Sequence, residues 1–172
     1  MKKVLYLAAL LFCATFTSCE KEEVGGTATE AMAGDWYVTC DAVDEAGNVV
    51  IEDPFDYGRV HILTYNTAAN ISDQLYIDDL DEIWEFKVKA TSDINALTFS
   101  TNGAIANETY EDCDVTITDG KILPMAGRQN NGSPADSIVF YVSFSDDPYP
   151  AAYGYAKYKV SGIRYSGLAE ND

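Results

Sequence analysis

The sequence predicts an all-β domain, an antiparallel barrel or sandwich of eight to ten strands. Apolar and polar residues alternate with a period of two along most of the chain after residue 34, and turn-forming residues recur at short intervals. No segment there has the 3.6-residue apolar stripe of an amphipathic helix. The chain has 172 residues, 47% of them hydrophobic, which is enough for one domain with its own core.

The first residues have the features of a secretory signal peptide. Two lysines follow Met1, and residues 4–16 form an apolar run that is shorter than the roughly 20 residues of a membrane-spanning helix. The run ends in Phe16-Thr17-Ser18-Cys19, which resembles a bacterial lipobox; the alternative is an ordinary signal with an incidental Cys. We expect a signal peptide at residues 1–18, and Cys19 as a lipidated N-terminus that carries palmitate-type acyl chains.

Residues 19–33 are predicted to tether the domain to the membrane through the lipid on Cys19. Their acidic start, residues 20–23, resembles the tract that follows the lipidated Cys in surface-exported lipoproteins of the Bacteroidetes; the alternative is a solvated charged linker. We therefore expect an outer-membrane lipoprotein that is exposed at the cell surface. Residues 30–33 are expected to form one helical turn before Gly34.

The barrel domain is predicted to occupy residues 34–172, and its clearest strand is 83–90, where Trp84, Phe86 and Val88 alternate with charged residues. The first two strands form a hairpin, residues 119–120 form a turn, and the glycines of the last strand suit a bend. Residues 127–135 form the longest stretch without a strand pattern, either a binding loop or a disordered excursion. In chain order, the predicted strands span residues 36–43, 49–51, 59–65, 74–77, 83–90, 97–101, 113–118, 121–123, 138–144 and 153–165.

The charge of the chain excludes several kinds of partner. Asp and Glu number 28 against 11 Lys and Arg, which gives a formal net charge of -17. Such a chain lacks the basic surface that binds nucleic acid, and anionic headgroups repel it. With one His in the sequence, chemistry that needs two His side chains is excluded.

Two of the four cysteines, Cys40 and Cys113, lie in the predicted barrel domain. Strand alternation places both thiols toward the core, and an exported protein folds in an oxidising compartment, where such a pair can form a disulfide. The alternative is two separate buried cysteines that act as small apolar residues. Neither has the paired spacing of a zinc site.

The start of the first strand, Gly34-Asp35-Trp36, resembles the opening motif of lipocalin-type barrels, in which the Trp closes one end. Together with the lipobox, the acidic tether and the domain size, it makes the chain similar to the Bacteroidetes lipocalin-like lipoproteins named "lipid-binding putative hydrolase". The resemblance covers roughly residues 34–165. It implies a lipocalin-like (calycin-type) barrel that binds a lipid or another apolar small molecule.

The residues themselves do not support hydrolysis. The chain has no Gly-x-Ser-x-Gly elbow, and its sole candidate base, His61, sits within a predicted strand, where a structural role is the usual one. The acidic residues at 78–82 and 146–147 lack the oxygen spacing of a calcium loop and are expected to be solvated turns. No Gly-rich phosphate loop follows a strand. We therefore expect no catalytic residue, no metal and no cofactor.

Aromatic residues are the best candidates for ligand binding. Inward residues of an eight-stranded barrel either fill its interior or line a cavity, and the sequence leaves both outcomes open. The candidate ligand contacts are Trp84, Phe86, Phe99 and Phe140, with Arg128 as an anion contact at the barrel mouth. A surface accessory protein that binds glycan, or a purely structural lipoprotein, is the alternative function. Tyr149, Tyr153 and Tyr155 would be its sugar contacts unless they only cover the barrel rim.

Overall fold

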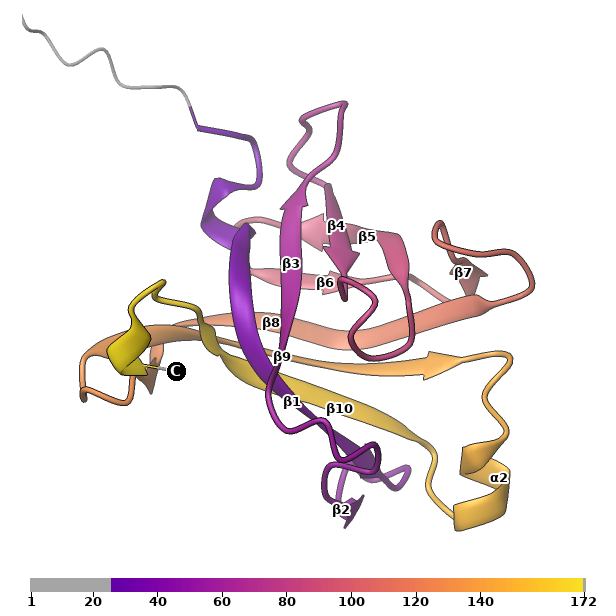
Figure 1. Ribbon diagram of the computed structural model, residues 1–172. Coiled ribbons are helices and arrows are strands. Elements are labelled where there is room, and N and C mark those ends of the chain that lie inside the picture. Colours follow the sequence, from indigo (N-terminus) through magenta and orange to yellow (C-terminus); the bar gives the residue numbers. More distant parts are fainter. Residues whose placement is uncertain (1–25, 172) are drawn as a thin grey trace, which may run out of the picture.

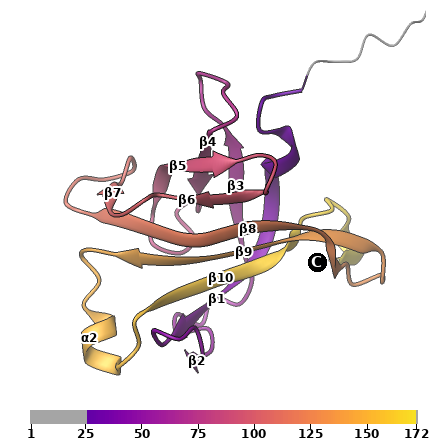
Figure 2. The same ribbon diagram turned by 180° about the vertical axis from the view of Figure 1, so that it is seen from behind.

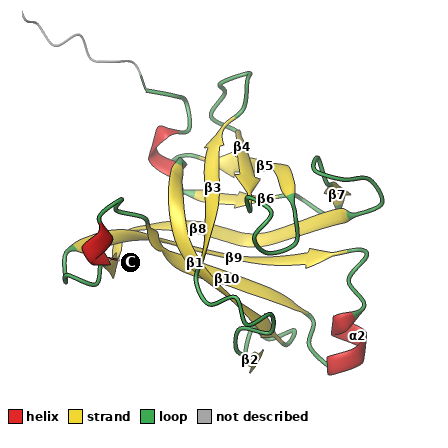
Figure 3. Ribbon diagram, in the orientation of Figure 1, coloured by secondary structure: helices red, strands yellow, loops and turns green. Residues whose placement is uncertain are grey.

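The computed structural model describes residues 26–171, and nearly all of its regular structure is β (Figure 1, Figure 3). Three short helical segments accompany the strands: the 3₁₀ helices η2 (Glu30–Met32) and η3 (Ala169–Asn171), and the helix α2 (Tyr149–Tyr153). The strands are β1 (Gly34–Val43), β2 (Val49–Ile51), β3 (Val60–Asn66), β4 (Gln74–Asp78), β5 (Lys87–Asp93), β6 (Thr98–Ser100), β7 (Ile105–Ala106), β8 (Asp114–Arg128), β9 (Pro134–Phe144) and β10 (Lys157–Arg164).

Eight of these strands close into an antiparallel barrel, as the sequence predicts. The sheet runs in the order β10-β9-β8-β6-β5-β4-β3-β1, and β1 also pairs with β10, which closes the ring. The strands β2 and β7 pair with β1 and β8 and lie outside the ring. Figures 1 and 2 agree that β2 and α2 lie at one end of the barrel and η2 at the other.

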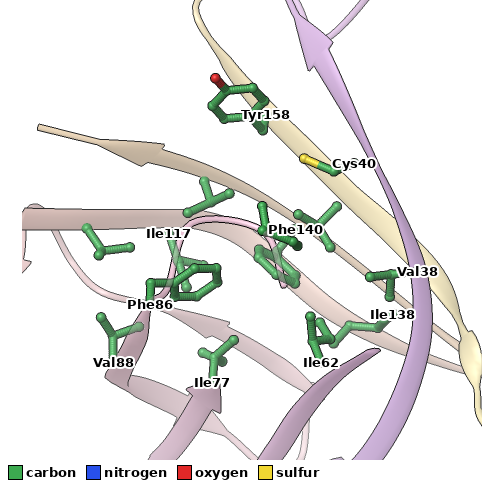
Figure 4. Packing of buried hydrophobic residues seen from close by; sticks show 14 of the residues in the cluster. Val38, Cys40, Ile62, Ile77, Phe86, Val88, Ile117, Ile138, Phe140 and Tyr158 are labelled. Atoms are coloured by element: carbon green, nitrogen blue, oxygen red, sulfur yellow. The ribbon is translucent and has the colours of Figure 1, made fainter. Parts of the chain in front are cut away.

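Alternating side chains of each strand point inward and form one core. In β1 every second residue from Trp36 to Ala42 is buried, namely Trp36, Val38, Cys40 and Ala42, and Val43 at the end of the strand is buried as well. Figure 4 shows side chains from opposite walls pointing toward one another. The largest fully buried side chains include Trp36, Phe86, Phe140 and Tyr158. Of the two outcomes that the sequence left open, the inward residues therefore fill the interior.

The Gly-x-Trp motif closes the η2 end of the barrel. Trp36 is fully buried, and its indole Nε1 donates a hydrogen bond to Thr64 Oγ1 at 2.8 Å. Thr64 in turn donates to the carbonyl oxygen of Met32 in η2, at 2.6 Å. The guanidinium of Arg164 lies 4.4 Å from the centre of the Trp36 ring and donates to the carbonyl oxygen of Ala33. This end of the barrel is thus covered by η2 and Arg164.

The strand predicted at 83–90 is wrong in its first half. The strand β5 begins at Lys87 because the backbone amides of Ile83, Trp84 and Phe86 donate hydrogen bonds to the carboxylate of Asp79 instead of a neighbouring strand. Glu85 has a φ of 52°, which lies outside the φ range of a regular strand.

Two further predictions along β8 and β9 are wrong. Residues 114–118 and 121–123 belong to one strand, β8, and Asp119 and Gly120 form a bulge in it instead of a turn. Four of the nine residues predicted as a long loop, 127–135, belong to the ends of β8 and β9, which pair up to Arg128 and Pro134. A hairpin loop of residues 129–133 remains between the two strands.

The last predicted strand, 153–165, starts later than expected. Residues up to Tyr153 form α2, which the strand pattern did not predict, and β10 begins at Lys157. Gly154 ends the helix with a φ of 78°, a left-handed conformation that glycine adopts without strain. The glycine therefore stops a helix here instead of bending a strand.

Candidate ligand-binding site

A pocket of about 440 Å³ opens at the end of the barrel opposite η2. It is lined by Ile51 of β2, by Pro54 and Phe55 of the following loop, and by three tyrosines, Tyr149, Tyr153 and Tyr155. The volume lies within the range of ligand pockets, and the lining combines apolar groups with a few polar tips, as such pockets usually do. We call it the aromatic pocket.

The helix α2 presents two of these tyrosines to the pocket. Asp147 Oδ1 accepts a hydrogen bond from the amide of Tyr149 at 2.8 Å at the start of the helix. Tyr149 and Tyr153 are four residues apart, so they share one helix face, and their ring centres lie 6.1 Å apart. Their exposed fractions are 43% and 63%. The three tyrosines proposed as sugar contacts thus line one pocket.

Behind the pocket wall, Tyr155 begins a buried hydrogen-bond chain. The hydroxyl of Tyr158 donates to Asp147 Oδ2 at 2.7 Å, and the hydroxyls of Tyr155 and Tyr158 lie 2.6 Å apart. Because Tyr158 has one proton and gives it to Asp147, Tyr155 is the donor in the bond between the two tyrosines. Burial and the bond to Asp147 raise the pKa of Tyr158 far above its usual range, so this chain stays protonated at neutral pH.

An aromatic cluster supports the Phe55 side of the pocket. The Phe55 ring lies 5.2 Å from that of Tyr158 and 6.0 Å from that of Trp84, measured between ring centres. Trp84 stacks on Phe144 at 5.1 Å with an angle of 11° between the planes. Its Nε1 donates to Asp146 Oδ1 at 3.1 Å. The loop at 79–86 therefore holds Trp84 against the pocket wall without placing it in the lining.

Asp79 fixes that loop. Its Oδ1 accepts hydrogen bonds from the amides of Asp81 and Phe86 at 3.1 and 2.8 Å, and its Oδ2 accepts from Ile83 and Trp84 at 3.1 and 2.7 Å. The side chain is fully buried. The expectation that the acidic corner is a solvated turn is therefore wrong for Asp79, which is the buried centre of a loop.

The structure does not bring the five predicted ligand contacts together. Phe86, Phe99 and Phe140 are buried in the core, and Trp84 lies beside the aromatic pocket. Arg128 lies on the β8–β9 hairpin, at the far end of β9 from Phe144 and α2, and its Nη1 donates to the carbonyl oxygen of Gly132 at 3.2 Å. Arg128 is thus remote from the aromatic pocket, while a ligand-binding role for the other four stays a prediction.

Cys40 and Cys113 are both buried, and both are free thiols. Burial raises the pKa of each thiol, and neighbouring carboxylates raise it further. Of the two alternatives, the structure contains separate buried cysteines. Neither is ionised at neutral pH, so neither has the reactivity of a catalytic thiol.

His61 lies on the outer face of the barrel, away from the aromatic pocket. Its Nδ1 is 2.8 Å from Asp35 Oδ1, and its ring packs against the rings of Tyr37 and Tyr165. Within residues 26–171, no group of three or more His, Cys, Asp or Glu side chains could hold a metal ion.

Three of the six residues that line the aromatic pocket were not predicted from the sequence to bind a ligand. Ile51, Pro54 and Phe55 surround two acidic residues, and their segment has no strand periodicity beyond Ile51. The available signal was Pro54-Phe55, an apolar pair in a segment otherwise polar enough to be a surface loop. An apolar pair in such a segment indicates local packing or a binding surface.

The predicted signal peptide, the lipidated Cys19 and the acidic tract lie outside the described residues. In the part of the chain that is described, no helix has the length and apolar character needed to cross a membrane.

The sequence model of one protein family, described as "Lipid-binding putative hydrolase", matches residues 21–169. No curated protein matches the chain. The match covers the whole barrel, both walls of the aromatic pocket and the segment before β1. The chain therefore belongs to the family of lipid-binding proteins that this description names.

Proposed function

We propose that the protein is a surface lipoprotein that binds one small apolar or amphipathic molecule in the aromatic pocket, without chemical conversion. The observation that carries the proposal is the pocket itself, a concave site of about 440 Å³ lined by Ile51, Pro54, Phe55 and three tyrosines. Aromatic rings offer a large apolar contact area, and tyrosine adds a polar tip for the head of an amphiphile.

The packing of the barrel favours its end over its interior as the binding site. Phe86 and Phe140 are fully buried in the middle of the core, where they take the space that a ligand occupies in a hollow barrel. A ligand in the aromatic pocket displaces no core side chain. Binding there leaves the barrel closed and its stability intact.

Three features favour binding over hydrolysis. The pair of His61 and Asp35 lies on the outer face, where Tyr37 and Tyr165 pack against the imidazole. Cys40 and Cys113 are buried thiols with a raised pKa. Nucleophilic catalysis needs an accessible nucleophile beside an oriented base, and none of these residues lines the aromatic pocket.

Anchoring through Cys19 suits the position of the pocket. The described chain begins at residue 26 beside η2, at the closed end of the barrel, while the pocket opens at the other end (Figure 1). A lipid at Cys19 would hold the closed end nearer to the membrane. Incorporation of labelled palmitate that Cys19→Ser abolishes would support the anchor, and unchanged incorporation would refute it.

The binding proposal is tested by extracting the purified protein with organic solvent and by native mass spectrometry of its complexes. We expect an apolar molecule at one per chain, lost in the double variant Tyr149→Ala, Tyr153→Ala, whose side chains are both exposed. Arg128→Ala is the matched control at the other end of the barrel. Ligand retained by the double variant would place the binding site elsewhere.

Glycan binding is the second candidate, and one observation favours it. Tyr149 and Tyr153 expose two rings on one helix face, an arrangement on which a sugar ring can stack. A glycan array separates the two functions: binding that Tyr153→Ala abolishes, with no extractable lipid, would favour glycan. If the protein binds no sugar on the array, the glycan function is refuted and the lipid ligand remains the proposal.

A further inference from the structure

We propose that the aromatic pocket selects amphiphiles whose polar end is a protonated amine and rejects those that end in a carboxylate. The inference rests on the proposed function, because it names the class of ligand for the same pocket. Three properties of the residues in and around the pocket carry it: their charge, the direction of the buried hydrogen bonds, and the aromatic faces.

Charge is the first property. None of the six side chains that line the pocket is a Lys, Arg or His. A second hollow, of about 390 Å³, shares Tyr155 with the pocket and is lined by Asp44 and Glu45. Hydrogen bonds from Asn48 lower the pKa of Asp44, so its carboxylate is charged at neutral pH. Negative charge therefore lines the hollow that adjoins the aromatic pocket at Tyr155.

The direction of the buried hydrogen bonds is the second property. Tyr155 gives its proton to Tyr158, and Tyr158 gives its own to Asp147, so Tyr155 has no proton left for a ligand. A carboxylate needs donors and finds none at this buried hydroxyl. The exposed hydroxyls of Tyr149 and Tyr153 donate as well as accept, so they accommodate either kind of head group. The chain ends at the partly buried carboxylate of Asp147, which adds negative charge behind the wall.

The aromatic faces are the third property. Phe55, Tyr149 and Tyr153 line the pocket together, and the negative face of an aromatic ring attracts a cation. The attraction is strongest where water is excluded, as in a pocket. An ammonium group is thus stabilised by the rings and by Asp44 and Glu45, whereas a carboxylate is repelled by both.

The test compares three twelve-carbon probes, dodecylammonium, dodecanol and dodecanoate, by isothermal titration calorimetry at pH 7, below their micelle concentrations. We expect dodecylammonium to bind about tenfold more tightly than dodecanol, and dodecanoate to bind more weakly than both. Glu45→Gln is expected to reduce the preference for the amine over the alcohol about two- to threefold. Glu111→Gln, an exposed carboxylate in another loop, is the matched control and should leave the preference unchanged.

Each outcome decides between the two proposals. Dodecanoate binding as tightly as dodecylammonium, or a preference that Glu45→Gln leaves intact, would overturn this inference while the pocket remained a lipid site. If none of the three probes binds, the proposed function fails and the inference fails with it. If both variants reduce the preference equally, the effect comes from the overall charge of the protein, and the local site is refuted.

Discussion

Replacing Asp79 by Asn is expected to destabilise the fold by about 3–5 kcal/mol. The carboxylate accepts four backbone hydrogen bonds, two on each oxygen, in a fully buried position. The amide of Asn keeps one accepting oxygen and turns a donor toward the other two amides. Two buried N–H groups then lose their partners, at a cost of about 1–3 kcal/mol each, and the remaining bonds lose their charge.

The assay is urea unfolding followed by circular dichroism and by tryptophan fluorescence, with equal m-values as the condition for comparing the two proteins. Asp81→Asn is the control, because Asp81 lies in the same loop with its side chain exposed; we expect a change within about 0.5 kcal/mol. A loss below about 1 kcal/mol for Asp79→Asn would refute the reasoning. It would show that the loop relaxes and returns its amides to water.

Three further predictions concern the same protein. Burial raises the pKa of Asp79 above its ordinary 3.8, and the four amides offset this only in part. The folded state therefore binds this proton more tightly than the unfolded state, and the stability advantage over Asp79→Asn should grow as pH falls through the raised pKa; a shrinking advantage in urea titrations across that window would contradict it. Gly162→Ala should cost about 3 kcal/mol, since a Cβ there would lie 2.1 Å from the carbonyl oxygen of Tyr37, whereas Ser161→Ala should cost little. Alkylation of Cys40 and Cys113, read by peptide mass spectrometry, should be roughly a hundredfold slower in the native protein than in urea, and equal rates would contradict their burial.

The strand faces follow from local sequence, because alternation requires only that one side of each strand be buried. Alternation left a barrel or a sandwich open, and the resemblance of Gly34-Asp35-Trp36 to lipocalin-type barrels implied the barrel. The same rule failed at residues 83–86, where Trp84 and Phe86 alternate with polar residues and are packed inward without being in a strand. These residues are not part of the sheet because their backbone amides donate hydrogen bonds to the buried carboxylate of Asp79 and are not available to a neighbouring strand. An acidic corner predicts a solvated turn unless the fold buries one of its carboxylates, and that depends on distant elements.

The bulge at Asp119 and Gly120 has a comparable cause. The pair has the composition of a tight turn, but β8 continues because β9 pairs with it on both sides of the bulge. Gly120 is required by its neighbour in β6: a Cβ at this position would lie 2.4 Å from the ring of Phe99. A turn and a bulge use the same residues, so only the pairing of remote strands separates them.

Only one of the two segments that line the candidate site could be predicted from the sequence, because the other reaches it through the pairing of distant strands. Tyr149, Tyr153 and Tyr155 stand close together in the sequence, so their clustering was visible, although the helix that aligns two of them was not. Ile51, Pro54 and Phe55 reach the same pocket from a segment about a hundred residues earlier, through the pairing of β1 with both β2 and β10. No local sequence pattern predicts that residues 51–55 lie close to residues 149–155.

The filled interior explains why the pocket is built from peripheral segments. An eight-stranded barrel has room for its own side chains or for one small ligand, and here Trp36, Phe86, Phe140 and Tyr158 occupy that space. The aromatic pocket is instead lined mainly by residues of β2, of the loop after β2 and of α2, and none of these segments belongs to the closed ring. Substitutions at exposed positions such as Tyr149 and Tyr153 can therefore change which molecule binds at little cost to the barrel; Tyr149 also loses an edge contact with Trp84, which is itself only partly buried. Tyr155 is the exception, since it contributes to the lining, the core and the hydrogen-bond chain to Asp147 together. A substitution of Tyr155 is therefore expected to change both the proposed preference for an amine and the stability of the fold.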